Sequence, residues 1–206
     1  MRFLIVNTDY PDFLLWFYAQ HPGLENRSYA EQIRSRYESL YGVADFYSKN
    51  LWALGHEAED VYANNEFLQK AWAATRGMVY EPVASVPVVS ALQRVRKVAG
   101  KTPARHLVPY MRSWLYRKQT LPRWSYDILK AQIEHYRPDV FLNQAVDSLS
   151  GQFVKEMKPF VRFIIGQHAA TVLSEDEDYS GYDLMISSFP PTVEWLKSKG
   201  LHACLS

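Results

Sequence analysis

Cysteine is nearly absent from this chain, with Cys204 the only one among 206 residues. An internal disulfide is therefore excluded, and a reducing compartment fits the composition best. Long hydrophobic runs are also absent, because the runs at residues 3–6 and 13–18 both end quickly. Each is too short for a signal peptide or a membrane span. These absences predict a soluble, cytoplasmic protein.

The signatures of common cofactor and metal sites are missing too. No G-x-G-x-x-G follows the first apolar run, and the chain has neither a Walker phosphate loop nor a G-x-S-x-G elbow. No Cys and His residues have the spacing of a zinc site. The acidic run 175–178 could bind a cation, but contiguous carboxylates in a loop are expected to form a solvated face. We therefore expect no metal and no bound cofactor.

Acidic residues are absent from one long segment. Between Pro82 and Tyr126 there is no Asp or Glu, whereas basic residues recur from Arg94 to Arg123. Prolines at positions 82, 87, 103 and 109 interrupt the segment, so residues 66–119 are expected to form a helical insertion with a basic solvent face. Contact of segment 94–123 with an anionic membrane surface, or with phosphates of a nucleotide or polymer, is the alternative. The net charge of +1 gives no general indication of nucleic-acid binding.

The first part of the chain reads as strand, helix, strand. Residues 2–7 are short and apolar, as in a strand buried on both faces, and residues 8–27 are expected to form a loop. Ser28 and Glu31 have the spacing of a capping box. Apolar residues three and four apart then predict one helix up to Leu54, ended by Gly55. Residues 57–63 are expected to form the second strand.

The same alternation returns after the basic segment. It predicts helices over 120–136, 148–157 and 190–199, and strands over 140–143, 161–165, 182–187 and 201–205. Strands that alternate with helices indicate a doubly wound parallel sheet, that is, a Rossmann-like α/β fold. We expect residues 1–206 to form one such domain. The end at Ser206, just after a strand, is interpreted as a domain border.

Candidate functional residues follow from this topology, because ligands of open parallel sheets bind beyond the carboxyl ends of the strands. Four short polar segments stand where the predicted strands stop. They are Asn7-Thr8-Asp9-Tyr10, Asn143-Gln144-Ala145-Val146-Asp147, Gly166-Gln167-His168 and Ser187-Ser188-Phe189. The alternative interpretation is that these residues only cap strands and begin helices.

His168 is the most informative of these residues. An imidazole can accept a proton near neutral pH or donate a hydrogen bond to a sugar hydroxyl or a phosphate. Gly166 would let a ligand approach the backbone closely. The alternative is a buried, hydrogen-bonded histidine without a chemical role.

Several of these segments carry a family resemblance. Residues 29–65, with Ala44-Asp45-Phe46-Tyr47-Ser48 and Leu54-Gly55-His56-Glu57-Ala58, resemble the N-terminal half of CgeB-like bacterial glycosyltransferases with the GT-B fold. Asp9-Tyr10-Pro11, Pro138-Asp139-Val140, Gly166-Gln167-His168 and Tyr182–Ser188 are similar as well. The resemblance spans most of the chain except residues 66–119.

The resemblance implies the acceptor-side domain of a metal-independent enzyme that moves a sugar from a nucleotide-sugar donor to an acceptor. A C-terminal domain, not contained in this sequence, would hold the donor nucleotide. His168 would face the cleft between the domains as a base or as a hydrogen-bond partner of the donor sugar, with Asp9 as the alternative base. Tyr10, Asn143 and Asp147 would shape the acceptor pocket.

Two other functions remain open at this level. One is a non-catalytic module of the same fold that binds a saccharide or a protein. The other is half of a sugar-nucleotide epimerase, which shares the two-domain architecture. The donor, the acceptor, the stereochemical outcome and the oligomeric state do not follow from the sequence.

Overall fold

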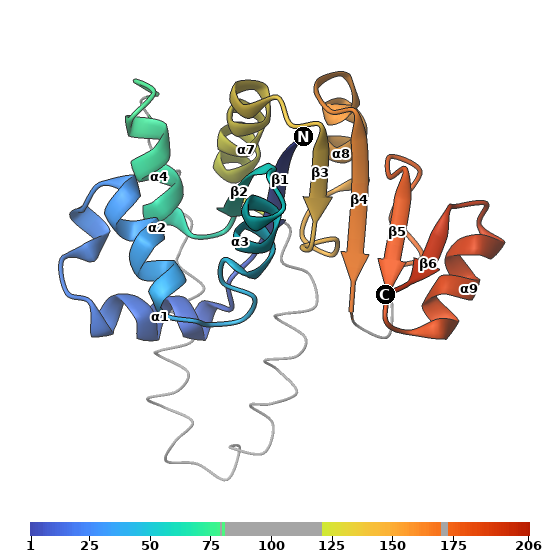
Figure 1. Ribbon diagram of the computed structural model, residues 1–206, viewed down its shortest axis with the longest axis horizontal. Coiled ribbons are helices and arrows are strands. Elements are labelled where there is room, and N and C mark those ends of the chain that lie inside the picture. Colours follow the sequence, from blue (N-terminus) through green and yellow to red (C-terminus); the bar gives the residue numbers. More distant parts are fainter. Residues whose placement is uncertain (79, 81–120, 170–172) are drawn as a thin grey trace, which may run out of the picture.

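A six-stranded, all-parallel sheet forms the centre of the molecule (Figure 1). The computed structural model describes residues 1–78, 80, 121–169 and 173–206. The strands are β1 (Arg2–Asn7), β2 (Glu57–Tyr62), β3 (Val140–Asn143), β4 (Phe163–His168), β5 (Leu184–Ser187) and β6 (Ala203–Leu205). Their order across the sheet is β2-β1-β3-β4-β5-β6. This confirms the predicted Rossmann-like, doubly wound α/β fold.

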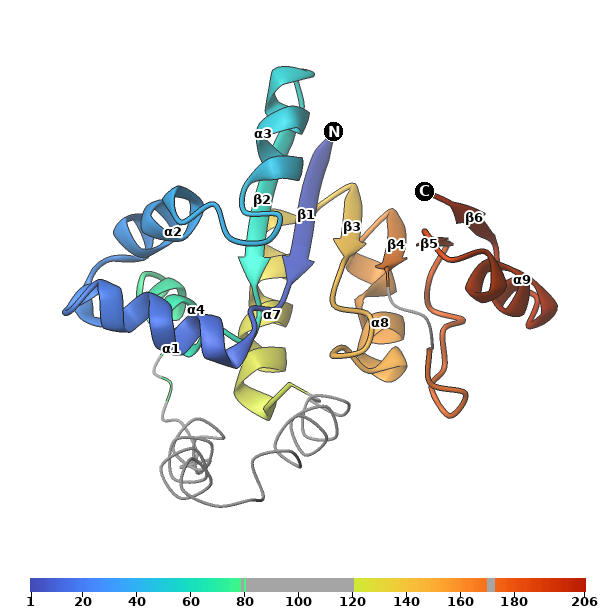
Figure 2. The same ribbon diagram turned by 90° about the horizontal axis from the view of Figure 1, so that it is seen from below.

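Helices lie on both faces of the sheet, but unequally. The described α-helices are α1 (Pro11–Gln20), α2 (Tyr29–Glu38), α3 (Phe46–Ala53), α4 (Glu66–Ala74), α7 (Arg123–Tyr136), α8 (Gly151–Met157) and α9 (Pro190–Ser198). Single 3₁₀ turns occur at Leu24–Asn26 and Lys158–Phe160. Figure 2 shows α3 on one side of the sheet, and α7 and α8 on the other. Most of the apolar core is therefore on the α7–α8 side.

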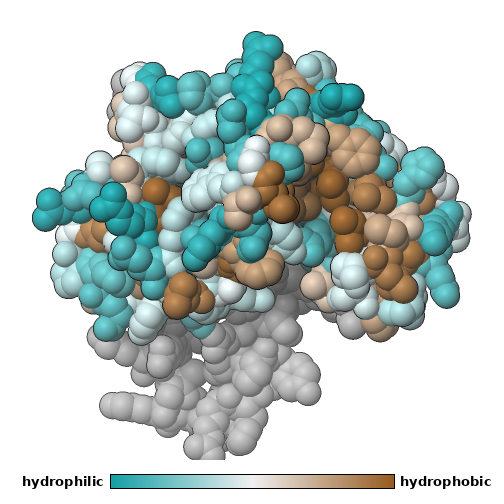
Figure 3. Space-filling view, viewed as in Figure 1, coloured by the Kyte–Doolittle hydropathy of each residue, from teal (hydrophilic) through white to brown (hydrophobic). Residues whose placement is uncertain are grey.

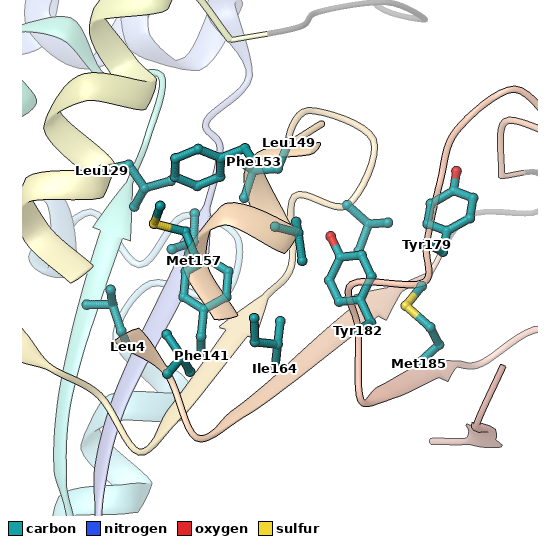
Figure 4. Packing of buried hydrophobic residues seen from close by; sticks show 14 of the residues in the cluster. Leu4, Leu129, Phe141, Leu149, Phe153, Met157, Ile164, Tyr179, Tyr182 and Met185 are labelled. Carbon is teal, nitrogen blue, oxygen red and sulfur yellow. The ribbon is translucent and has the colours of Figure 1, made fainter. Parts of the chain in front are cut away.

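The core follows from the alternation of side chains along the strands. Leu4 and Phe141 point to the α7–α8 side, where they pack with Met157 and Ile164 in the largest cluster of buried residues (Figure 4). Ile5, one residue after Leu4, points to the other face and packs with α3. Successive residues of a strand thus contribute alternately to the packing on the α7–α8 side and on the α3 side of the sheet.

The predicted long helix from Ser28 to Leu54 is wrong, because the chain forms two helices there. Between α2 and α3, Leu40, Gly42 and Ala44 all have positive φ angles, of 52°, 60° and 39°. Left-handed residues cannot continue a right-handed helix, so α2 ends at Glu38 and α3 begins anew at Phe46. The apolar spacing that suggested one helix is the sum of two shorter amphipathic segments.

Three further expectations about the first part of the chain have different outcomes. The predicted loop 8–27 contains α1, which begins at Pro11 in the first helical position, where proline is favoured. The capping box is confirmed: the Glu31 backbone N–H donates to the Ser28 hydroxyl, and the Ser28 N–H donates to the Glu31 carboxylate at 3.0 Å. Gly55, with φ of 80°, ends the second helix as predicted.

The acidic run is largely solvated, as expected, since Glu175, Asp176 and Asp178 are exposed and Glu177 is half-buried. The Gly151 N–H donates to Glu177 Oε1 at 2.6 Å, and Lys155 forms an ion pair with Asp178. Glu177 therefore contacts the beginning of α8, and Asp178 forms an exposed ion pair farther along the same helix. Within the described ranges, no group of three or more His, Cys, Asp or Glu side chains is placed to hold a metal ion.

The helical insertion expected at residues 66–119 falls mainly outside the described residues. Only α4, at its beginning, is described, and it is helical as predicted. The basic segment 94–123 also lies outside, apart from residues 121–123. No helix in the described ranges has the length and apolar character needed to cross a membrane.

A buried carboxyl under α3 gives a first testable prediction. Asp60 is 4 % exposed, and its Oδ2 accepts hydrogen bonds from the hydroxyls of Ser48 and Tyr37. Burial raises the pKa of Asp60 from 3.8 to about 6. Between these values the folded protein keeps a proton that the unfolded chain has lost. The free energy of unfolding therefore falls by about 3 kcal/mol as the pH rises through this window.

We expect Asp60→Asn to remove this pH dependence. Its free energy of unfolding should gain about 3 kcal/mol relative to wild type between pH 4 and pH 7. Urea denaturation of both proteins at several pH values measures the difference. A constant difference across this range would show that Asp60 titrates normally in the folded protein.

Candidate functional site

The carboxyl edge of the sheet contains a topological switch point between β1 and β3. These strands are neighbours, but the chain leaves β1 toward β2 on one side and reaches β3 by crossing to the other. In open α/β sheets, ligands bind in the crevice at such a point. Asn7 ends β1, and Asn143 ends β3. The polar segments predicted from the sequence therefore lie at the expected place.

Three amide side chains and one hydroxyl form a continuous row at this edge. Asn7 Nδ2 donates to Gln144 Oε1 at 2.5 Å, and Gln144 Nε2 donates to Gln167 Oε1 at 2.7 Å. Gln167 Nε2 in turn donates to the Tyr47 hydroxyl at 3.0 Å. All four side chains are half-buried. We call these four residues the amide row; it crosses from β1 over β3 to β4 and carries no charge.

Tyr47 is the member of the amide row that the sequence interpretation missed. It was assigned to the apolar face of a long helix. In the structure it lies in the first turn of α3, whose beginning is at the carboxyl edge of the sheet. Its position in the chain could have indicated this role. A crossover helix begins near the carboxyl end of the strand that precedes it, so residues in its first turn lie at that edge of the sheet.

His168 and Asp147 form a second polar group at the same edge. His168 Nδ1 lies 3.5 Å from Asp147 Oδ2; the histidine side chain is 5 % exposed and that of the aspartate 56 %. The Nε2 atom is buried and has no hydrogen-bond partner among the described residues. Burial lowers the pKa of His168 and the Asp147 carboxylate partly opposes this, so the neutral imidazole is favoured.

The structure corrects the predicted boundaries of the strand before this group. Residues 161–165 were expected to form the strand, with Gly166, Gln167 and His168 in the loop after it. Instead, β4 runs from Phe163 to His168. Because consecutive strand residues point to opposite faces, Gln167 lies on the α3 side and His168 on the α7–α8 side. The amide row and the His168–Asp147 pair are therefore separate parts of one edge.

Gly166 has a packing role in the described structure. A Cβ atom at this position would lie 2.5 Å from Met185 Sδ and 3.0 Å from the Tyr182 ring. The glycine thus lets β5 and the chain before it pack closely. Asn143 contributes to the same packing, since its Nδ2 donates to the Tyr182 hydroxyl at 2.6 Å and its Oδ1 accepts from the Ala145 N–H at 2.8 Å.

The remaining predicted positions differ in exposure. Ser187 is buried, and its hydroxyl accepts from the Phe189 N–H at 3.1 Å, as an ordinary capping residue would. Ser188 is exposed at the end of β5. The Tyr10 side chain is 66 % exposed and meets Tyr41 edge to face. Of these three, only Ser188 and Tyr10 are accessible to a ligand.

Asp9 is held in an ion pair that the sequence did not reveal. Arg36 Nη2 donates to Asp9 Oδ1 at 2.6 Å, and Nε donates to both carboxylate oxygens at 3.1 and 3.2 Å. Both side chains are buried, and the guanidinium lies over the rings of Phe13 and Tyr62. Burial raises the pKa of Asp9, and the Arg36 guanidinium opposes that shift. This geometry gives Asp9 a structural role and leaves its predicted role as a base without support.

Comparisons with models of protein families, with curated proteins and with solved structures found no match.

Proposed function

We propose that this chain is the acceptor-side domain of a glycosyltransferase, with the amide row as the binding site for acceptor hydroxyls. The amide row is the observation that carries the proposal. Each amide presents a donor and an acceptor, as a sugar hydroxyl does, and none requires a counter-ion. The row also lies at the switch point, where ligands of this fold class bind.

The chemistry is proposed to be metal-independent. A nucleotide-sugar donor would be held by a second domain of the same enzyme, as the family resemblance implies. Positive groups and helix N-termini there would stabilise the departing diphosphate. We place the protein in the cytoplasm, where its one exposed thiol, Cys204, would stay reduced.

His168 is proposed as the base for an acceptor hydroxyl that extends beyond the amide row, because the row and His168 lie on opposite faces of β4 at the same edge of the sheet. Its neutral form is favoured, and the hydrogen-bonding capacity of Nε2 is not used by any described residue. Asp147, beside Nδ1, would keep the proton on that nitrogen and the lone pair on Nε2. A buried polar atom without a partner is costly, so its persistence is consistent with a chemical role.

A non-catalytic saccharide-binding module is the second candidate. The burial of His168 Nε2 favours it, because a base must reach the proton that it removes. The pairing of Asp9 with Arg36 has the same implication. Release of nucleoside diphosphate from a panel of nucleotide sugars would distinguish the enzyme from the module.

Loss of binding in an amide-row variant tests the site itself. Gln144→Leu combined with Gln167→Leu removes the central amides, and we expect glycoside binding to weaken by roughly ten- to thirty-fold. Saturation-transfer NMR with a panel of simple glycosides measures this. Gln152→Leu is the matched control, because Gln152 is exposed on α8 and its amide donates to the Glu156 carboxylate on the same exposed face. Equal affinities in all three proteins would refute the site.

A further inference from the structure

The described elements cover the α3-side face of the sheet over only part of its width. Among the described elements, α3 packs on this face against Ile5 of β1 and Ala58 of β2. From β2 onward the connections through α7, α8 and α9 lie on the opposite face, as right-handed crossovers require when the sheet grows in one direction. Figure 2 shows that no described helix lies over β4 and β5 on the α3 side.

The side chains on this uncovered area are apolar. On β4 they are Phe163 and Ile165; their neighbours on β5 are Leu184, paired with Ile165, and Ile186, paired with Gln167. Phe163 is 40 % exposed, and the other three are half-buried. We call Phe163, Ile165, Leu184 and Ile186 the apolar strip; Figure 3 shows hydrophobic surface over this part of the sheet. All-parallel sheets normally have both faces covered, so exposed apolar surface here indicates an interaction site.

The apolar strip is continuous with the amide row. Gln167 belongs to the row, and its same-face neighbours are Ile165 two residues earlier and Ile186 across the ladder. Hydrogen-bonding groups and an uncharged aliphatic surface therefore meet at one side chain. A ligand that fits both would have a hydroxylated end at the carboxyl edge and a hydrocarbon end directed down β4 and β5.

We propose that the acceptor is a glycolipid-like molecule, whose sugar binds the amide row and whose hydrocarbon chain lies on the apolar strip. This inference rests on the proposed function and names its acceptor class. The four side chains of the strip carry no charge. An alkyl chain can therefore cover them without burying an unpaired ion.

The dimensions of the strip favour this occupant over a second copy of the chain. From Phe163 to Gln167 the strand rises roughly 13 Å, and two strands are roughly 10 Å wide, giving a footprint of about 130 Å². A stable protein interface needs about 800 Å² on each partner. The strip is much too small for that, but it is long enough for an alkyl chain of several carbons.

The dependence of affinity on chain length tests the proposal in the wild-type protein. Each fully buried methylene contributes a factor of about four, and a chain on a flat face buries about half of its surface. We therefore expect the dissociation constants of methyl, butyl and hexyl β-glucosides to fall about two-fold per methylene, or about thirty-fold from methyl to hexyl. Chemical-shift titration measures all three.

Three variants and one reference ligand complete the experiment. Ile186→Lys should reduce the gain per methylene, whereas Leu54→Lys, at an exposed position after α3, should leave it unchanged. Ile186→Thr repeats the test with a milder change in polarity. Hexanol should bind more weakly than hexyl glucoside, because it lacks the sugar.

The other possible results would refute the glycolipid inference, the proposed function or both. Methyl glucoside binding that depends on Gln144 and Gln167, without any gain from longer chains, would refute the glycolipid inference and leave the proposed function intact. Failure of every glycoside to bind would refute both. Hexanol binding as tightly as hexyl glucoside, or a dimer in sedimentation experiments that Ile186→Lys abolishes, would show that the strip has another occupant.

Discussion

Arg36→Met is expected to lower the free energy of unfolding by about 3–5 kcal/mol, because it leaves the Asp9 carboxylate buried without its partner. The two groups are joined by three hydrogen bonds of 2.6 to 3.2 Å, and their side chains are 3 % and 1 % exposed. The variant also loses the contacts of the guanidinium with the rings of Phe13 and Tyr62, at 4.7 and 4.2 Å. Urea denaturation monitored by circular dichroism measures the loss.

A double-mutant cycle separates the ion pair from its surroundings. Asp9→Asn combined with Arg36→Met removes both charges, so the double variant should be more stable than Arg36→Met alone. Lys155→Met is the matched control: it breaks the exposed ion pair with Asp178 and should cost less than about 1 kcal/mol. Equal losses in Arg36→Met and Lys155→Met would show that Asp9 is not buried as the structure has it.

The same ion pair shows why the sequence predicted the sheet better than the loops before it. The strands follow from short apolar runs that stop at a polar residue, and their neighbours follow from the order of helices between them. The break between α2 and α3 is instead accompanied by one short-range and one long-range contact. Arg36 Nη1 donates to the Tyr41 carbonyl at 3.1 Å, and the Tyr41 ring stacks on Phe13 at 3.8 Å. Nothing in the local spacing indicates these contacts.

The candidate site was predictable to a similar extent. The switch-point rule selected Asn7, Gln144 and Gln167, which the structure joins through hydrogen bonds. The rule gives the edge of the sheet but not the face, so it did not separate Gln167 from His168. Gly166, Gln167 and His168 were expected in a loop, where no alternation of faces applies, whereas β4 includes them and alternates them. Such boundaries are the least reliable part of a sequence interpretation. Asn143 and Ser187 also lie at the ends of strands, but both are buried. Their side chains form hydrogen bonds with Tyr182 and with the Phe189 N–H.

Loss of transferase activity in His168→Ala is the second large effect that we expect. Removing a general base lowers the rate by about 10²–10⁴-fold. In the proposed two-domain enzyme, kcat/KM should rise with pH as the imidazole loses its proton, and become constant above a pKa below the usual 6.5, because burial lowers the pKa of His168. Nucleoside diphosphate release measures the rates. His202→Ala, an exposed histidine before β6, is the control.

Substitution of Asp147 tests the same role of His168 through the pH profile, which would not change if the histidine were only structural. Its carboxylate stabilises the charged imidazolium, so Asp147→Asn should lower the pKa of His168 further and move the acidic limb of the profile to lower pH. Asp147→Glu should restore the wild-type profile. Imidazole ¹⁵N shifts of the chain alone should show the proton on Nδ1 in the wild-type protein and a mixture of tautomers in Asp147→Asn.

Wild-type turnover in His168→Ala would show that His168 takes no part in the chemistry. Unchanged ¹⁵N shifts in Asp147→Asn would show only that Asp147 does not set the tautomer of His168. The two roles are thus separable, and only the absence of nucleoside diphosphate release by the wild-type protein would favour the binding-module alternative.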